Sequence, residues 1–403
     1  MSWVIRVAKP ARIARGRRGS AHPVDLYHWR LWSHWPWRRR LAALAMNLPQ
    51  AALALTGLGQ AGSLRRAVRD LADALKWNVH PTELRVARES GVGGAAGALI
   101  GNYDKKGINL LLNPRAFPKR DSILFDKARF AAFIARQSGM TGIPTLAQGD
   151  LAAGLPAWIE AAGELIFKPG FSSRGRGIFG LRRHGLGWVA ERGGREQPVA
   201  DLLAWAQSAL GPGDVLQQRL RTHEALAALS PGALPTLRLV TCLDEFGAIE
   251  LVDATLRLGR GSVIVDNFSA GGLAAPVDLA TGVAGPARSK SSRWRIGSHD
   301  VHPSTGAPIA GFALPGWDEA KRQAVLGHRA LLGEDFLLVG WDVALAEDGP
   351  VILEGNWNPG GNLLQTVSGR GIAATRLGAL YRHHLARLPD ARFRDAPVLT
   401  FSR

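Results

Sequence analysis

The sequence predicts a globular protein of the α+β class whose sheets are antiparallel or mixed. Its composition, 46% hydrophobic and 21% charged over 403 residues, is too apolar for a disordered chain and is typical of a globular α/β or α+β protein. Between these two classes, the expected strands outnumber the helices that could connect parallel strands, which favours antiparallel or mixed sheets. The length corresponds to about two to three domains.

Charge and cysteine content narrow the setting of the protein. The formal net charge is +17, which favours anionic partners in general. Nine of these seventeen charges lie in residues 1–40, so the rest of the chain is only mildly basic. Cys242 is the only cysteine, which excludes an intramolecular disulfide and any cysteine-cluster metal site. A single cysteine suits the reducing cytoplasm, where we expect the protein.

Residues 1–40, here called the arm, are basic and contain five tryptophans. Because Pro23 and Pro36 interrupt any helical stripe, we favour a poorly ordered, solvated arm. The alternative is contact with an anionic membrane surface, which would place the protein peripherally at the inner membrane; no specific nucleic acid is expected. Polar residues interrupt the apolar residues 41–62, which therefore predict a helical element and not a membrane anchor.

The remaining elements follow from the periodicity of apolar residues. Helices are expected at residues 64–77, 121–139, 199–210 and 318–333. Strands are expected at residues 164–169, 177–183, 214–220, 236–243, 248–258, 337–346 and 351–354. In the helix at 121–139, Asp126 or Ser122 can cap the start, and Phe130, Phe133 and Ile134 form one apolar face.

The last two strands carry the most informative polar residues. Every odd position of strand 337–346 is apolar, so Asp342 lies on the opposite face. A three-residue turn over 347–349 would place Asp342 opposite Glu354. A two-residue turn would separate the two carboxylates.

With the three-residue turn, Glu354 and Asn356 share the face of Asp342, while Val351 and Leu353 join the apolar face. Two carboxylates and an amide oxygen at one strand end suit Mg²⁺ that is shared with phosphates. The alternative is a solvated hairpin face with ordinary acids. We favour the metal site, because the apolar pattern and the ligand geometry select the same register.

Lysines point to a second candidate region. Only nine of the fifty cationic side chains are lysines, so a lysine retained in a motif is informative. Lys168 ends an expected strand and precedes the glycine-rich segment 169–177, whose backbone N–H groups could converge on phosphate oxygens. Lys127 is another candidate, although alone it would be interpreted as a helix-surface cation. The segment is not a P-loop, since no Gly-Lys-Ser/Thr opens a helix there.

Taken in order, these motifs resemble the ATP-grasp ligases. The resemblance rests on Asp126-Lys127, Gly142-Ile143-Pro144, Phe167-Lys168-Pro169, Asp214-Val215-Leu216-Gln217-Gln218, Gly340-Trp341-Asp342 and Glu354-Gly355-Asn356. Residues 235–241, 265–272 and 302–306 look like the sugar-transfer-associated branch, which is related to α-L-glutamate ligases. The resemblance covers residues 100–385.

The resemblance implies an ATP-grasp fold, in which two α+β subdomains clamp ATP between them. The arm and a mainly helical region at 41–120 would precede a subdomain at 121–212 that holds the lysines and the glycine loop. A metal-binding subdomain at 213–390 would follow.

The roles of the family's residues transfer to matching positions. The resemblance implies nucleotide contacts for Lys127 and Lys168 at the α- and β-phosphates, for a mobile loop with Ser172, Ser173, Gly175 and Gly177, for the hinge residues Gln217, Gln218, Arg219 and Leu220, and for Glu224 as a ribose-binding acid. It implies Mg²⁺, or Mn²⁺ in its place, on Asp342, Glu354 and Asn356, and catalytic roles for Lys168, Arg257 and Asn267 at the γ-phosphate and the acyl intermediate. Gly340 stands where the peptide ligases have an arginine, so Arg238 or Arg257 must supply the transition-state cation.

The implied activity is ATP- and Mg²⁺-dependent ligation of a small-molecule carboxylate to a small-molecule amine through an acyl phosphate, with a place in polysaccharide or cell-envelope biosynthesis. The alternative is a non-catalytic nucleotide-binding or scaffold protein of polysaccharide assembly. The complete metal-ligand set favours catalysis.

Overall fold

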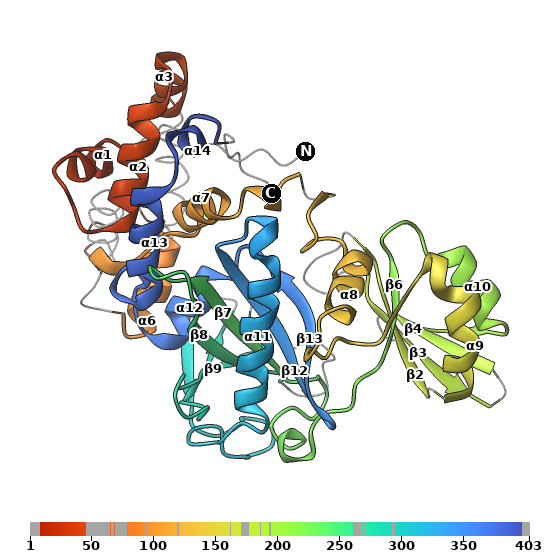
Figure 1. Cartoon of the computed structure of the whole chain (residues 1–403). Coiled ribbons are helices and arrows are strands. Elements are labelled where there is room, and N and C mark those ends of the chain that lie inside the picture. Colours follow the sequence, from red (N-terminus) through yellow and green to blue (C-terminus); the bar gives the residue numbers. More distant parts are fainter. Residues whose placement is uncertain are drawn as a thin grey trace.

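The computed structural model describes most of the chain. The described residues are 9–45, 65, 68, 79, 81–92, 96–118, 121–161, 163–170, 177–185, 187–192, 195–260, 268, 271–291 and 295–396. They form two antiparallel sheets, and helices from the N-terminal and C-terminal parts of the chain pack together beside the larger sheet (Figure 1). This arrangement confirms the predicted α+β class.

The smaller sheet has six strands in the order β1-β6-β2-β3-β4-β5. Their bounds are Thr145–Ala147 (β1), Val215–Gln218 (β6), Glu164–Lys168 (β2), Phe179–His184 (β3), Gly187–Arg192 (β4) and Arg195–Val199 (β5). Helices α9 (Leu151–Ala161) and α10 (Leu202–Ala209) cover one face of this sheet, where Leu155, Leu165 and Leu202 share one core (Figure 1).

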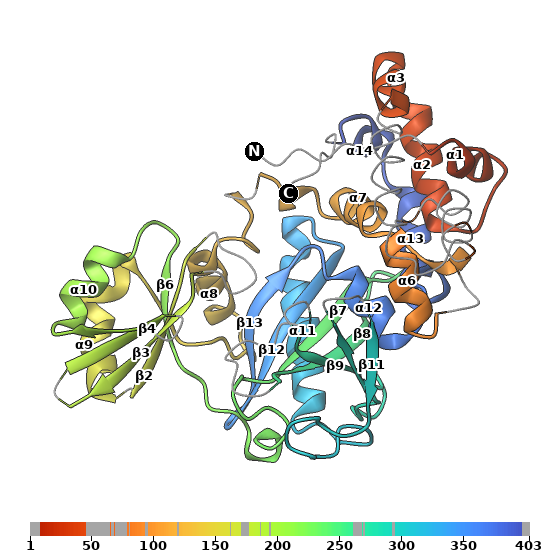
Figure 2. The same ribbon diagram turned by 180° about the vertical axis from the view of Figure 1, so that it is seen from behind.

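The larger sheet has seven strands in the order β11-β10-β9-β8-β7-β12-β13. Their bounds are Ile296–His299 (β11), Ala287–Lys290 (β10), Leu273–Pro276 (β9), Ile249–Leu258 (β8), Thr236–Leu243 (β7), Leu338–Ala346 (β12) and Gly349–Asn356 (β13). Helix α11 (Trp317–Leu331) packs on one face, where Trp341 and Val343 of β12 are buried. Helix α8 (Lys127–Ala135) lies between the two sheets in both views (Figures 1 and 2).

The other helices form a layer on the opposite side of the larger sheet, and several of them pack on one another rather than on its strands. They are α1 (Pro10–Arg17), α2 (Pro23–His34), α3 (Trp37–Ala45), α6 (Pro81–Glu89), α7 (Asn102–Leu112), α12 (Gly361–Ser368), α13 (Arg376–Arg387) and α14 (Asp390–Arg394). Six short 3₁₀ turns complete the described elements: η1 (Ala96–Ala98), η2 (Pro114–Ala116), η4 (Gln148–Asp150), η5 (Glu224–Leu226), η7 (Leu332–Glu334) and η8 (Ile372–Ala374). No described helix is both long enough and apolar enough to cross a bilayer.

The prediction of a poorly ordered, solvated arm is wrong for helices α1 and α2. Helices α1 and α2 fold against each other, and α2 buries Val24, Tyr27 and Leu31 in a core shared with α7 and α13. Pro23 does not interrupt this arrangement, because it occupies the first turn of α2, where a missing N–H is tolerated.

Several expected elements differ in extent or lie outside the described residues. Helix α8 starts only at Lys127, because the side chain of Asp126 caps it by accepting a hydrogen bond from the N–H of Arg129. Most of the expected helix at 64–77 and most of the apolar stretch 41–62 lie outside the described residues. Strand β5 was not predicted, since its first four residues are exposed and polar or proline and show no alternation.

Candidate active site

The paired strands β12 and β13 bring Asp342 and Glu354 together. Asp342 lies directly opposite Glu354, and Gly340 lies opposite Asn356. The predicted pairing of the two acids is therefore present in the structure.

The turn that produces this pairing differs from the prediction. Ala346 pairs with Gly349, so only Glu347 and Asp348 lie between the strands. The two-residue turn does not separate the acids, because a β-bulge shifts the register beside Asp342, where Leu353 is the extra residue.

The bulge also changes which residues face the core. Ile352, not Val351, joins the core under α11. Val351 and Leu353 instead pack with Ile143 and Ala344 in a separate small cluster, so the prediction that these two join the main apolar face is wrong.

Asp342 is held by two arginines from the same sheet. Arg238 of β7 donates from Nε to Oδ1 and from Nη2 to Oδ2, the latter at 3.0 Å. Arg257 of β8 donates from Nη1 to Oδ2 at 3.2 Å. Burial of Asp342 opposes its ionisation, but the charges of Arg238 and Arg257 prevail and lower its pKa to about 2. Asp342 is therefore a carboxylate at neutral pH.

Glu354 has the opposite behaviour. The pKa of Glu354 is raised, because nearby protein atoms displace water from its carboxyl group and because the charge of Asp342 disfavours a second negative charge. The charges of Arg238 and Lys168 oppose this increase, and the Glu354 residue as a whole is exposed. Lys168 is the last residue of β2, as predicted. Its charge acts on Glu354, whereas Asp342 is bound by the two arginines.

Lys127 connects helix α8 to the start of the glycine-rich segment. Its Nζ donates to the carbonyl oxygens of Pro169 at 2.9 Å and Gly170 at 3.0 Å. Burial lowers the pKa of Lys127, while the charges of Glu354 and Asp214 oppose that decrease. Both candidate lysines therefore interact electrostatically with Glu354.

The described end of the glycine-rich segment has restricted geometry. Gly177 has φ +78°, and a Cβ there would lie 2.9 Å from the ring of Pro169, so a larger residue would be strained. The Gly170 N–H donates to Oδ1 of Asp214 at 2.7 Å, a contact that the sequence did not indicate. Ser172, Ser173 and Gly175 lie outside the described residues, as does Asn267.

The four hinge candidates are placed by strand β6, which pairs with β2 so that Val215 lies opposite Lys168. Gln217 is buried and donates from Nε2 to Oγ1 of Thr145 at 2.9 Å. Gln218 follows it, Arg219 forms an exposed ion pair with Glu164 at 2.9 Å, and Leu220 is half-buried. Glu224 is exposed in η5, and within the described part of the chain no hydrogen bond joins it to Asp342 or Glu354.

Two further residues reach the site from helix α7. Lys105 donates from Nζ to Oδ1 of Asn358 at 2.6 Å and also to the carbonyl oxygen of Pro359, just beyond β13. Asn109 donates from Nδ2 to the same Oδ1 at 2.9 Å. The scarcity of lysine could have indicated Lys105, but nothing local indicates that α7 lies beside residue 358.

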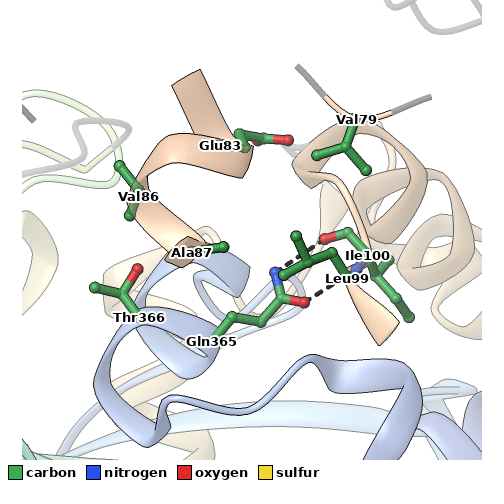
Figure 3. Close-up of a pocket in the computed structure, with 8 residues that line it drawn as sticks. All are labelled: Val79, Glu83, Val86, Ala87, Leu99, Ile100, Gln365 and Thr366. Carbon is green, nitrogen blue, oxygen red and sulfur yellow. Dashed lines mark hydrogen bonds between the residues drawn. The ribbon is translucent and has the colours of Figure 1, made fainter. Parts of the chain in front are cut away.

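A narrow cavity between α6 and α12 lies apart from this site. Its lining is mainly apolar, and the side chain of Gln365 crosses it to exchange hydrogen bonds of 3.0 and 3.1 Å with the backbone of Ile100 (Figure 3). We assign it no role in the chemistry.

The donor chemistry of the acid pair suits Mg²⁺. Asp342, Glu354 and Asn356 offer two carboxylates and an amide, with Nδ2 of Asn356 3.4 Å from Oε1 of Glu354. Hard oxygen donors in this small number leave positions for phosphate oxygens and water. No group of three or more His, Cys, Asp or Glu side chains that could hold a metal occurs among the described residues.

Lys168 thus lies on the smaller sheet, Lys127 on helix α8, and the acid pair on the larger sheet. A model of the family described as sugar-transfer associated ATP-grasp matches residues 109–379, more than half of the chain. The chain belongs to this family, as the motifs predicted. No curated protein matches the chain.

Solved structures that are similar to this chain include several ATP-grasp ligases. D-alanyl-alanine synthetase A from Vibrio cholerae is 12% identical, with a TM-score of 0.38 over 66% of this chain and 66% of that one. The ATP-grasp ligase PsnB with its minimal precursor is 15% identical, with a TM-score of 0.35 over 65% of this chain and 61% of that one. D-alanine–D-alanine ligase from Bacillus anthracis is 12% identical, with a TM-score of 0.34 over 66% and 69%. The chain thus spans just under two thirds of the first two structures.

Proposed function

We propose that the protein is an ATP- and Mg²⁺-dependent carboxylate–amine ligase that acts through an acyl phosphate. The observation that supports this most strongly is the Asp342–Glu354 pair, which has arginines on one acid and the charges of two lysines acting on the other. Such a concentration of opposite charges is suited to a phosphoryl group in transfer.

In the proposed reaction, a carboxylate oxygen of the acid attacks the γ-phosphorus of ATP. The bond from this phosphorus to the β,γ-bridging oxygen breaks, and ADP leaves. The nitrogen of the amine then attacks the acyl carbon, inorganic phosphate leaves, and the nitrogen loses a proton. The product is an amide, and no protein nucleophile is required.

We propose a separate role in this reaction for each group of residues in the site. Lys127 and Lys168 would bind the α- and β-phosphates, and Arg257 and Arg238 would meet the transferred phosphoryl group from the side of Asp342. Mg²⁺, held by Asp342, Glu354 and Asn356, would neutralise phosphate charge when bound. Remaining nucleotide contacts are proposed for the loop residues Ser172, Ser173, Gly175 and Gly177, for the backbone of Gln217, Gln218, Arg219 and Leu220, and for Glu224, with Asn267 at the acyl intermediate.

The test is a screen of acids paired with amines, with release of phosphate and ADP as readouts. We expect release that requires acid, ATP and Mg²⁺ together and that increases with the correct amine. ATP binding without turnover for every pair would instead support a nucleotide-binding scaffold. The family's association with sugar transfer supports acids and amines from polysaccharide or cell-envelope biosynthesis as the first set.

We also propose that helix α3 contacts an anionic membrane surface from the cytoplasmic side. Trp37 and Leu41, one helical turn apart, are 64% and 57% exposed. Arg38 lies over the Trp37 ring at 5.4 Å, so apolar and cationic groups meet at the same place. The membrane contact that the sequence suggested for the whole arm is here limited to α3, because Lys9 and Arg12 are buried in ion pairs and cannot reach a membrane surface.

Co-sedimentation with vesicles tests this contact. Binding to vesicles with 30% anionic lipid, and not to neutral vesicles, should be lost in the double variant Trp37→Ser/Leu41→Ser. The matched control is Phe246→Ser, which removes an exposed aromatic side chain elsewhere. Equal binding of both variants would exclude α3 as the contact.

A further inference from the structure

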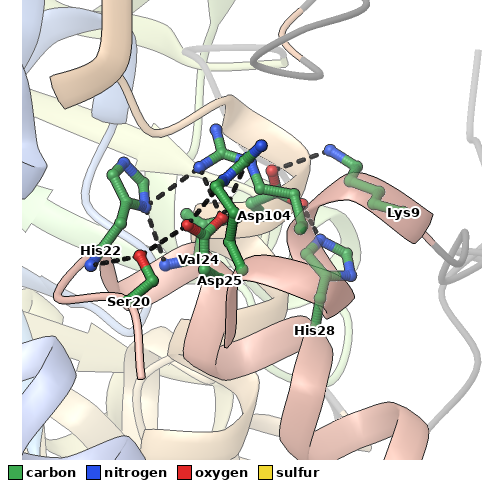
Figure 4. A network of polar contacts seen from close by, with 9 residues as sticks. Lys9, Ser20, His22, Val24, Asp25, His28 and Asp104 are labelled. Atoms are coloured by element: carbon green, nitrogen blue, oxygen red, sulfur yellow. Dashed lines mark hydrogen bonds and ion pairs between the residues drawn. The ribbon is translucent and has the colours of Figure 1, made fainter. Parts of the chain in front are cut away.

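Helix α7 carries two adjacent charged residues that point to different parts of the molecule. Asp104 accepts hydrogen bonds from Nζ of Lys9 at 2.8 Å and, with the ring protonated at that nitrogen, from Nε2 of His28 at 3.0 Å (Figure 4). All three side chains are buried. Asp104 therefore fastens α1 and α2 to α7.

Lys105 points to the other side, toward the segment that follows the acid pair. Lys105 is 2% exposed, and its ammonium group donates hydrogen bonds to Asn358 and Pro359. Asn109, one turn later, binds the same amide oxygen and in turn accepts a hydrogen bond from the hydroxyl of Tyr381 in α13 at 2.7 Å. The segment just after β13 is thus held by two side chains of α7, one of which is itself bound by α13.

The contacts of Lys105 compensate its positive charge only in part. Its ammonium group donates to an amide oxygen and a carbonyl oxygen, neither of which carries a full negative charge. Burial, with the nearby charge of Arg238, lowers the pKa of Lys105 to about 7. Replacing a buried charge with an apolar side chain of similar size is often neutral or stabilising. Folding alone therefore does not explain a lysine at this position.

We infer that Lys105 is a positioning residue, which together with Asn109 fixes Asn358 and Pro359 and thereby holds the end of β13, with Glu354 opposite Asp342 and Asn356 opposite Gly340. This inference rests on the proposed function of that acid pair. Helices α1 and α2 support the same contact from behind, because they are fastened to the preceding residue of α7.

The experiment compares Lys105→Met with Lys106→Met, its neighbour on α7. Each is assayed for melting temperature, for kcat and KM with Mg²⁺ and ATP, and for Mn²⁺ affinity with ADP by electron paramagnetic resonance. Loss of a residue that orients metal ligands typically costs about 10–100-fold in metal affinity or activity. We expect a loss of that size for Lys105→Met in Mn²⁺ affinity and kcat, with an equal or higher melting temperature, and no loss for Lys106→Met.

A second variant keeps the inference testable if Lys105→Met does not fold. Asn358→Ala removes the acceptor shared by Lys105 and Asn109 and should weaken Mn²⁺ binding to the same extent. The double variant should lose clearly less than the sum of the two single losses, because both changes remove the contact between Lys105 and Asn358. Wild-type Mn²⁺ affinity in Asn358→Ala, or additive losses in the double variant, would overturn the inference.

The two hypotheses fail separately. If no acid and amine pair supports turnover by the wild-type protein, the proposed ligase activity fails. The Mn²⁺ measurement still decides whether Lys105 positions the acid pair.

Discussion

Asp342 is the residue on which the charges of the site converge. It is 5% exposed and binds both Arg238 and Arg257, so its carboxylate balances two cations as well as facing Glu354. Glu354 is exposed and accepts a hydrogen bond from the side chain of Asn356. The two acids therefore differ in what they contribute to stability, although we propose that they share one metal.

The first prediction follows from this difference. Asp342→Asn should abolish turnover and also lower the melting temperature, because breaking a buried ion pair from one side costs about 3–5 kcal/mol. Glu354→Gln should abolish turnover and melt like the wild type. Calorimetry with a phosphate-release assay checks both. A wild-type melting temperature for Asp342→Asn would contradict the buried ion pairs of Asp342 with Arg238 and Arg257.

The second prediction concerns Lys127, which combines a positive charge with two hydrogen bonds to the start of the glycine-rich segment. Lys127→Met should weaken ADP binding at least about tenfold, as expected for loss of a charge-assisted contact to phosphate. Isothermal titration measures the affinity, with Lys321→Met on α11 as the control. Unchanged ADP affinity in Lys127→Met would remove this residue from the nucleotide site.

At the scale of elements, the contact between α6 and α7 is sensitive to pH. Oε1 of Glu83 in α6 accepts a hydrogen bond of 3.2 Å from the N–H of Asn102, the first residue of α7. Burial raises the pKa of Glu83 to about 7. Between its ordinary value of 4.5 and about 7, the folded protein keeps a proton that the unfolded chain releases. Glu83 thus makes stability decrease as pH rises through this range.

The third prediction is that Glu83→Gln reduces this decrease. Glutamine keeps the acceptor for Asn102 and cannot ionise, so the variant should gain stability relative to the wild type between pH 5 and pH 7.5. Thermal unfolding at both pH values measures the gain. Parallel curves for the two proteins would show that Glu83 titrates normally.

Elements also show where sequence reasoning succeeds and where it fails. The odd positions of β12 follow a local alternation, and the prediction that Val339, Trp341 and Val343 face the core is confirmed. The bulge at Leu353 could not be predicted from the neighbouring sequence. It depends on both the two-residue turn and the packing of Ile352 under α11, and α11 is a separate element of the fold. The sequence therefore predicted the pairing of Asp342 with Glu354 correctly, although it did so from a three-residue turn that the structure does not have.

At the scale of the whole molecule, described helices from the N-terminal and C-terminal parts of the chain form one layer. Helix α2 packs on α13 and α14, and Nη1 of Arg30 donates to the carbonyl oxygen of Leu385 at 2.7 Å, 355 residues away. Lys9 reaches Asp104 in the same layer. The arm is therefore part of the structure that supports the acid pair.

The fourth prediction is that the arm is needed for stability and for turnover. Deleting residues 1–40 should lower the melting temperature and turnover together, because it leaves Asp104 buried without Lys9 and His28. The control is Arg17→Gln/Arg18→Gln, which removes two exposed arm charges and keeps the helices. Full turnover by the stable, truncated protein would contradict this account.

The sequence by itself determined the class, the family and the residue types of the candidate site, because strand alternation, the Asp126 cap and the order of the motifs are local properties. Only the tertiary structure decided which groups meet. Asp342 pairs with arginines 104 and 85 residues away, and Lys105 reaches a segment 253 residues away. Local pattern determines which face of an element is apolar, whereas the partner of a buried charge depends on which distant element the fold places opposite it.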